Sequence, residues 1–158
     1  MEYVTHSLRE TYELATRFIN GQLPCSCEKK KITCSSIGGA TIVGLFGELG
    51  SGKTSFTQGV ACALKVKDQI TSPTFVLEKI YKLARKFPFE HLIHIDCYRL
   101  DGAKEMSALG WDEIKSDPKN IIFVEWPDRV REAMPEDIMK IYFETGDKEN
   151  ERKIKILC

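Results

Sequence analysis

Apolar residues in the middle of the chain occur in short runs that are typical of strands. Residues 41–46 and 120–125 are almost continuously apolar, as in strands that are buried on both faces of a sheet. Residues 76–81 alternate between apolar and polar types, and residues 91–95 have a similar strand pattern. We therefore expect four strands here, with 41–46 and 120–125 at the centre of a sheet.

Two other segments have apolar residues at helical spacing. Residues 54–64 carry one apolar face, which predicts a helix soon after the first buried strand. A second helix is expected from Ser7 to about Ile19, because Ser7 and Glu10 have the spacing of a capping box.

The C-terminal part of the chain predicts a β-hairpin. Residues 138–143 and 152–157 have strand patterns, and Thr145-Gly146-Asp147 lies between them as a turn. Because strands are mixed with helices, the expected fold class is α/β, with three layers, a mixed and mostly parallel central sheet and this C-terminal hairpin. Residues 1–158 are expected to form one domain.

A polar excursion that carries cysteines is expected at about 22–37 of this domain. Cys25, Cys27 and Cys34 could hold zinc, but no fourth cysteine or histidine lies nearby in the sequence to complete a tetrahedral site. The segment is therefore interpreted as an exposed loop.

An eight-residue motif follows the first buried run and predicts a phosphate-binding loop. It has the pattern G-x-x-x-x-G-K-[ST], in which backbone amides surround the phosphates. Lysine supplies a charge to the β- and γ-phosphates, and threonine supplies a hydroxyl ligand to Mg²⁺. A strand before the motif and a helix after it favour this interpretation over a ligand-free turn, and make the expected fold P-loop NTPase-like. The residues are Gly47, Glu48, Leu49, Gly50, Ser51, Gly52, Lys53 and Thr54.

Two carboxylates end different strand candidates and are expected at the metal. Glu125 closes the run 120–125, where a loop of this kind needs an acidic residue that reaches Mg²⁺ directly or through water. Asp96 follows 91–95 and could hold a metal-bound water or act as a base. We interpret His94 as a packed strand residue and leave it out of the site.

One further segment and one further residue each have two possible roles. Residues 71–75, T-S-P-T-F, form either a switch-like loop that responds to a γ-phosphate or an ordinary turn. Arg99 either contacts phosphate or forms a surface ion pair.

Composition limits the classes of partner. The chain has 23 basic and 23 acidic residues and a net charge of +0, so the strongly basic surface of a nucleic-acid-binding protein is not expected. DNA is excluded on this basis, and tRNA is expected only through a partner protein. Neither a signal peptide nor an apolar stretch of about 20 residues is found, so we expect a cytoplasmic protein without a membrane partner.

Four ordered motifs together resemble one family. G-E-L-G-S-G-K-T, S-P-T-F, H-I-D-C-Y-R-L and V-E-W-P closely resemble the TsaE (formerly YjeE) family over nearly the whole chain. These are small bacterial ATPases required to form threonylcarbamoyladenosine beside the anticodon of tRNA. The resemblance implies ATP and Mg²⁺ as cofactors and hydrolysis that is weak without partners. It also implies action on a complex of the TsaB and TsaD proteins, which hydrolysis drives through its cycle.

The resemblance also implies roles for individual residues. Lys53 and Thr54 take the roles of the phosphate loop and Glu125 the acidic metal position. Asp96 takes that of the catalytically important carboxylate, with contact to the metal either direct or through water. Thr74 corresponds to a switch-like threonine, and Trp126 to the tryptophan after the glutamate, unless it is a core aromatic. The adenine is expected beside Ser7, Thr11 and Arg152.

Three other functions share part of this pattern. A small-molecule kinase would need a second pocket and a lid of arginines, for which Arg129 and Arg131 are candidates on a short segment. A GTPase would need the N-K-x-D signature, which the sequence lacks. A nucleotide-gated assembly factor would bind ATP with only incidental hydrolysis.

Overall fold

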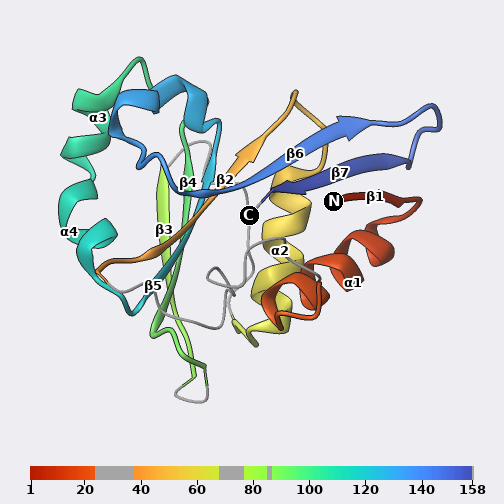
Figure 1. The fold of residues 1–158 in the computed structure, drawn as a ribbon, viewed down its shortest axis with the longest axis horizontal. Coiled ribbons are helices and arrows are strands. Elements are labelled where there is room, and N and C mark those ends of the chain that lie inside the picture. Colours follow the sequence, from red (N-terminus) through yellow and green to blue (C-terminus); the bar gives the residue numbers. More distant parts are fainter. Residues whose placement is uncertain (24–37, 68–76, 85–86, 158) are drawn as a thin grey trace.

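The described residues form one seven-stranded sheet flanked by helices (Figure 1). The computed structural model describes residues 1–23, 38–67, 77–84 and 87–157. The strands are β1 (Glu2–Thr5), β2 (Thr41–Phe46), β3 (Glu78–Lys82), β4 (His91–Asp96), β5 (Asn120–Glu125), β6 (Met139–Thr145) and β7 (Arg152–Leu157). The helices are α1 (Leu8–Ile19), α2 (Lys53–Ala63), α3 (Ala103–Ala108), α4 (Trp111–Ser116) and the 3₁₀ helix η1 (Pro127–Ala133).

The sheet is parallel in its middle and antiparallel at its edges. Its order is β1-β7-β6-β2-β5-β4-β3, in which β6, β2, β5 and β4 run parallel to one another. The hairpin β6–β7 and the edge strands β1 and β3 pair antiparallel. The predicted mixed, mostly parallel sheet with a C-terminal hairpin is confirmed.

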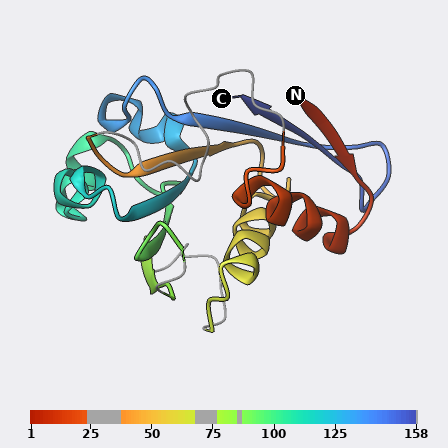
Figure 2. The same ribbon diagram turned by 60° about the horizontal axis from the view of Figure 1, so that its bottom comes forward.

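Each face of the sheet has its own hydrophobic core, so the expected three layers are present. Val43 and Leu45 of β2 face a core shared with α1 and α2. Ile42, on the opposite face of the same strand, belongs to a core shared with α3, α4 and η1. Alternate residues of β2 are therefore buried in different layers, which explains why the whole strand is apolar in sequence. Figure 2 shows α1 and α2 side by side on one side of the sheet.

Several element boundaries differ from the sequence expectation. The strands expected at 41–46 and 120–125 have those bounds, whereas the strand expected at 76–81 is observed as Glu78–Lys82, with Val76 outside the described residues. The edge strand β1 and the short helices α3, α4 and η1 were not anticipated. The expected cysteine excursion at 22–37 lies almost wholly outside the described residues. Among the described residues, no helix is long and apolar enough to cross a bilayer.

The topology brings the ends of three chemically important segments together at one end of the central strands. Strands β2, β5 and β4 are parallel neighbours, so their carboxyl ends lie side by side. Glu125 at the end of β5 is in register with Leu45 on one side and Asp96 on the other. The loop between β2 and α2 begins at this end of the strands.

Candidate functional site

The loop between β2 and α2 depends on glycine at its first position. Gly47 has φ +138, and a Cβ there would collide with the carbonyl oxygen of Phe143 in β6. Gly52, at the other end of the loop, has φ +104 and is the residue from which α2 starts. Only glycine combines these backbone angles with the close approach of β6 to Gly47.

The first turn of α2 lacks the usual capping groups. The N-cap residue, Gly52, has no side chain with which to cap the helix, and the first turn carries no acidic residue. Amides at a helix start have no partner within the helix, and together with the helix dipole they favour an anion. The helix start and the loop before it therefore suit a phosphate group.

Lys53 is held inside this loop by backbone oxygens and an aromatic ring. Its Nζ donates hydrogen bonds to the carbonyls of Gly47, at 2.6 Å, and Glu48, at 2.8 Å. The same nitrogen lies 4.1 Å from the ring centroid of Trp126. The residue is 4% exposed, and this burial lowers the pKa of its amine, an effect that the charges of Glu125 and Asp96 oppose.

Glu125 joins the loop to the middle of the sheet. Its Oε1 accepts a hydrogen bond from the Thr54 hydroxyl at 2.8 Å and lies 2.8 Å from Nε2 of His94. A carboxylate oxygen can only accept, so the histidine nitrogen is the donor. Glu125 is 3% exposed. The Thr54 hydroxyl, which is predicted to bind the metal, is thus hydrogen-bonded to the carboxylate that is predicted to bind the same metal.

Asp96 is the neighbour of Glu125 on the next parallel strand. It is 4% exposed, and its Oδ1 accepts a hydrogen bond from the backbone amide of Tyr98 at 3.0 Å. Side-chain donors hold Glu125, whereas a backbone amide two residues along the chain holds this oxygen of Asp96. The two carboxylates thus lie side by side but are oriented by different groups.

Trp126 has a contact with both the core and the loop. Its backbone is left-handed, with φ +58, at the point where the chain leaves β5. Its ring packs against the core on the α3–α4 side of the sheet and lies under the Lys53 amine. The ring of Tyr98 is 5.2 Å from it, and the Arg129 guanidinium is 5.8 Å from the ring of Tyr98. The two interpretations of Trp126 are therefore compatible.

The donor set fits a magnesium-bound phosphate. Ser51 Oγ in the loop is buried and finds no hydrogen-bond partner among the described residues. In the described part of the chain, no group of three or more His, Cys, Asp or Glu side chains could hold a metal ion. One hydroxyl and two carboxylates suit Mg²⁺ when phosphate oxygens and water supply the other ligands.

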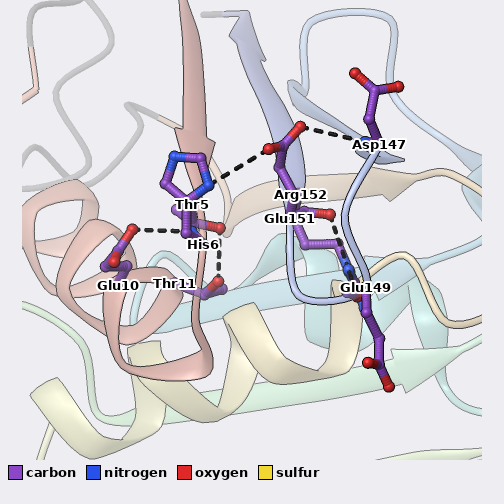
Figure 3. Close-up of polar contacts among 8 residues, drawn as sticks. All are labelled: Thr5, His6, Glu10, Thr11, Asp147, Glu149, Glu151 and Arg152. Carbon is purple, nitrogen blue, oxygen red and sulfur yellow. Dashed lines mark hydrogen bonds and ion pairs between the residues drawn. The ribbon is translucent and has the colours of Figure 1, made fainter.

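The residues expected beside the adenine lie where β1, α1 and β7 meet, and Figure 3 shows two of them, Thr11 and Arg152. The Arg152 side chain lies against the loop, 3.8–3.9 Å from the position of a Cβ on Gly52. Its Nη1 donates to the carbonyls of Glu149 and Glu151, both at 2.8 Å. Arg152 therefore adjoins the start of α2.

The other two residues of this group have internal partners. Thr11 Oγ1 is 2.9 Å from Thr5 Oγ1 (Figure 3), and it donates a hydrogen bond to the carbonyl oxygen of Ser7 at 3.2 Å. Ser7 Oγ accepts a hydrogen bond from the Glu10 amide. Contact of Ser7 and Thr11 with adenine stays a prediction, as does the role of Thr74, which lies outside the described residues.

A hollow of about 310 Å³ adjoins the first residues of the loop. Phe46 and Tyr142 stack beside it with ring centroids 4.8 Å apart. Sequence reasoning did not find this hollow, because its two sides come from segments almost 100 residues apart, 46–48 and 142–145. Its lining is Phe46, Gly47, Glu48, Tyr142, Phe143, Glu144 and Thr145.

Sequence reasoning also missed the contact of His94. The side chain is completely buried, as expected for a packed strand residue, but it bonds to Glu125. A signal was available: His94 and Asp96 are two positions apart on one strand and so point to the same face, and a polar residue in a buried run requires a partner.

Comparisons with known sequences match the chain to one family. A family model described as "Threonylcarbamoyl adenosine biosynthesis protein TsaE" matches residues 5–154. The tRNA threonylcarbamoyladenosine biosynthesis protein TsaE of Streptomyces coelicolor is 40% identical over 101 residues, or 63% of this chain and 66% of that protein. The protein of that name from Bacillus subtilis is 34% identical over 122 residues, or 77% of this chain and 73% of that protein.

A solved structure agrees with the fold. The crystal structure of Bacillus subtilis YdiB superposes with a TM-score of 0.65 and 23% identity, covering 99% of this chain and 83% of that one. The chain spans 66% of the Streptomyces relative and 64% of the TsaE protein of Borreliella burgdorferi, less than two thirds of either. The family model, however, covers nearly all of this chain, and the chain therefore belongs to the TsaE family.

Proposed function

We propose that this protein is a Mg²⁺-dependent ATPase required to form threonylcarbamoyladenosine beside the anticodon of tRNA. In this proposal it works in the cytoplasm on a complex of TsaB and TsaD, and hydrolyses ATP only weakly without them. The observation that carries the proposal is the 2.8 Å hydrogen bond from Thr54 in the loop to Glu125 at the end of β5. It joins the hydroxyl and the carboxylate that a nucleotide-bound Mg²⁺ would require.

Binding of the triphosphate depends on a change of partners at Lys53. The amine now donates to the carbonyls of Gly47 and Glu48, and phosphate oxygens are stronger acceptors for an ammonium group. The uncapped amides of α2 and the Ser51 hydroxyl provide further donors to the same anion. Thr54, Glu125 and Asp96 would hold Mg²⁺, which when bound neutralises charge on the phosphates.

The two buried carboxylates have different roles in hydrolysis. Glu125 is fixed through Oε1 by two side chains, which suits a constant position at the metal or its water shell. Asp96, its neighbour in register, acts on the attacking water, either by orienting it or by accepting its proton. Burial excludes bulk water from both groups and strengthens their electrostatic effect.

Arg152 is proposed to border the adenine, with Ser7 and Thr11 as outer members of that wall. Its contact with Gly52 puts its long side chain beside the start of α2. The switch role of Thr74 is retained as a proposal from the family resemblance.

A partner-dependent switch agrees with the charge of the chain. A net charge of +0 does not favour independent capture of tRNA, which is therefore proposed to be bound through TsaB and TsaD. The γ-phosphate would favour one arrangement of the loops, and the partner would bind that arrangement better.

Phosphate release and partner binding test this proposal together. The purified protein is incubated with ATP and Mg²⁺, with and without the TsaB–TsaD pair, and free phosphate and any phosphorylated acceptor are measured. We expect free phosphate, with faster release when the pair is present, and nucleotide-dependent capture of the pair in a pull-down. Phosphate on an acceptor would indicate a kinase, and binding of ATP and of the pair without release would indicate a nucleotide-gated assembly factor.

A further inference from the structure

His94 occupies an unusual position for a histidine. It lies on β4 between β5 and β3, with Phe123 and Lys79 as its neighbours in register, and its side chain is 0% exposed. Nε2 is 2.8 Å from Oε1 of Glu125. Nδ1 is also buried and has no hydrogen-bond partner among the described residues. The one hydrogen-bond partner that this ring has in the described part of the chain is therefore a residue of the proposed site.

We propose that His94 is a positioning residue that fixes the orientation of the Glu125 carboxylate for ATP hydrolysis. This inference rests on the proposed function of Glu125. His94 itself touches neither phosphate nor metal in this proposal, and it acts only through the carboxylate.

The two donors to Glu125 differ in how firmly they are held. The Thr54 hydroxyl can rotate about its C–O bond, and its oxygen is also the proposed metal ligand, so its hydrogen bond can change when the site is filled. The His94 ring is completely buried against one face of the sheet, and its packing on β4 fixes the direction in which Nε2 donates. His94 therefore supplies the constant hydrogen bond at Oε1.

This arrangement leaves the second oxygen of Glu125 available. Both hydrogen bonds reach Oε1, and no described residue donates to Oε2. With Oε1 held by His94, rotation of the carboxylate about its last bond is restricted, and Oε2 keeps one direction. A carboxylate without this restraint would sample several orientations, and small displacements of a reacting group lower the rate strongly.

The orphaned Nδ1 gives an independent sign of the same role. A neutral imidazole has one N–H, and a buried N–H without an acceptor is rare in proteins. With the proton on Nε2 and directed at Glu125, Nδ1 carries no hydrogen, so the nitrogen without a partner is the one that needs no acceptor. A histidine kept only for packing would have no reason to direct its N–H to this carboxylate.

The test compares a variant that keeps a donor with one that does not. In His94→Gln the amide nitrogen reaches close to the position of Nε2, whereas His94→Met has a similar size without a donor. His91, at the start of the same strand, gives the matched control: its Nδ1 is 3.2 Å from Asn120 Oδ1, away from Glu125. His91→Gln and His91→Met are made beside the two His94 variants.

For each variant, the melting temperature, the ATP affinity with and without Mg²⁺, and the rate of phosphate release are measured. We expect His94→Met to lower kcat by roughly 10- to 100-fold, the range seen when partners of ligating side chains are removed, with a much smaller change in KM. His94→Gln should recover most of this loss, and both His91 variants should match the wild type. Equal losses in His94→Gln and His94→Met, or no loss in His94→Met, would overturn the proposal.

A measurement on the nucleotide-free protein separates this inference from the proposed function. The ring nitrogens of the protein's three histidines are observed by ¹H–¹⁵N NMR in the wild type, Glu125→Ala and Asp101→Ala. We expect the His94 ring to carry its proton on Nε2 and to shift in Glu125→Ala, but not in the exposed-loop control Asp101→Ala. A His94 ring that is insensitive to Glu125→Ala would overturn the inference even if the protein hydrolyses ATP. A shifted ring in a protein without ATPase activity would instead contradict the proposed function. If His94→Met does not fold, His94→Gln and the NMR measurement still decide the question.

Discussion

The helices α1 and α2 lie side by side on one face of the sheet, but their first turns are built in opposite ways (Figure 2). At the start of α1, Ser7 Oγ accepts a hydrogen bond from the Glu10 amide, and the Glu10 carboxylate accepts one from the His6 amide at 2.8 Å. An acidic residue in the first turn also complements the helix dipole. At the start of α2, Gly52 provides no cap, and the first residue of the helix is Lys53.

The difference shows that the N-terminus of α1 is capped by groups of the protein itself, whereas that of α2 is not. A cation at a helix N-terminus opposes the helix dipole, and burial of Lys53 adds a desolvation cost. Fixing the three glycines of this loop also costs conformational entropy on folding, because glycine loses more backbone freedom than any other residue. The capping side chain and the acidic residue that stabilise the start of α1 are thus missing at α2. A bound polyanion would instead accept hydrogen bonds from the uncapped amides of α2. Departures from the usual capping pattern are typical of functional sites.

The largest expected effect is the loss of the charge at the start of α2. Lys53→Ala should lower ATP affinity by roughly 100-fold or more, because a charge-assisted hydrogen bond contributes up to about 3 kcal/mol and Lys53 is expected to make more than one. Isothermal titration with ATP and Mg²⁺ measures the effect. Lys65→Ala, just beyond the other end of α2, is the control and should bind normally. An unchanged affinity in Lys53→Ala would remove this residue from the site.

Removal of either carboxylate near α2 should impair the protein, but binding and hydrolysis should be affected differently in the two variants. Asp96→Ala should still bind ATP but release phosphate about 100-fold more slowly, in the range for loss of a general base. Glu125→Ala should weaken Mg²⁺-dependent binding and hydrolysis together. Titration and phosphate release are measured in parallel, and Asp101→Ala serves as the exposed control. Wild-type turnover in Asp96→Ala would show that the H-I-D-C-Y-R segment has no catalytic role.

A change behind the start of α1 should affect stability rather than binding. Thr11→Val leaves the buried hydroxyl of Thr5 without its partner and should lower the free energy of unfolding by about 1–3 kcal/mol. Valine keeps the shape of the side chain, so ATP affinity should stay close to that of the wild type. Urea denaturation provides the measurement, and Thr16→Val is the control, because that hydroxyl bonds to the Tyr12 carbonyl of the same helix. A large loss of ATP affinity without loss of stability would place the Thr11 hydroxyl on the ligand.

The smallest expected effect is removal of the cap of α1. Ser7→Ala should lower the free energy of unfolding by about 1 kcal/mol. ATP affinity should change only slightly, because the hydroxyl that is removed bonds to the Glu10 amide and Ser7 is only an outer member of the proposed adenine wall. The comparison between the two helix starts would fail if Ser7→Ala weakened ATP binding as strongly as a loop substitution. It would become sharper if ATP raised the melting temperature of Ser7→Ala by as much as that of the wild type.

The sequence predicted the local parts of the site better than their contacts. The runs 41–46 and 120–125 and the phosphate-loop motif could be recognised because each depends on neighbouring residues alone. The capping box at Ser7 is correct as a helix start, although Glu10 bonds to the amide of His6 rather than to that of Ser7.

Contacts between strands could not be predicted in the same way. The bond of His94 to Glu125 depends on the order β5-β4 in the sheet, which no local pattern contains. The four-residue strand β1 is defined by its pairing with β7, and helices of six residues, such as α3, are too short to show a period. The packing of Arg152 against Gly52 joins residues 100 positions apart, and it depends on the pairing of β7 with β6 and of β6 with β2.

The packing of Gly47 against β6 sets how much sequence change the loop can accept. Any other residue at position 47 meets two independent barriers, a backbone at φ +138 and the carbonyl oxygen of Phe143. Gly50 in the same loop has φ +78 but open space around a Cβ, so asparagine or aspartate, which enter the left-handed region most readily, can replace it at low cost. In a library that samples every amino acid at both positions, functional clones should therefore carry only glycine at 47 and a small polar set at 50.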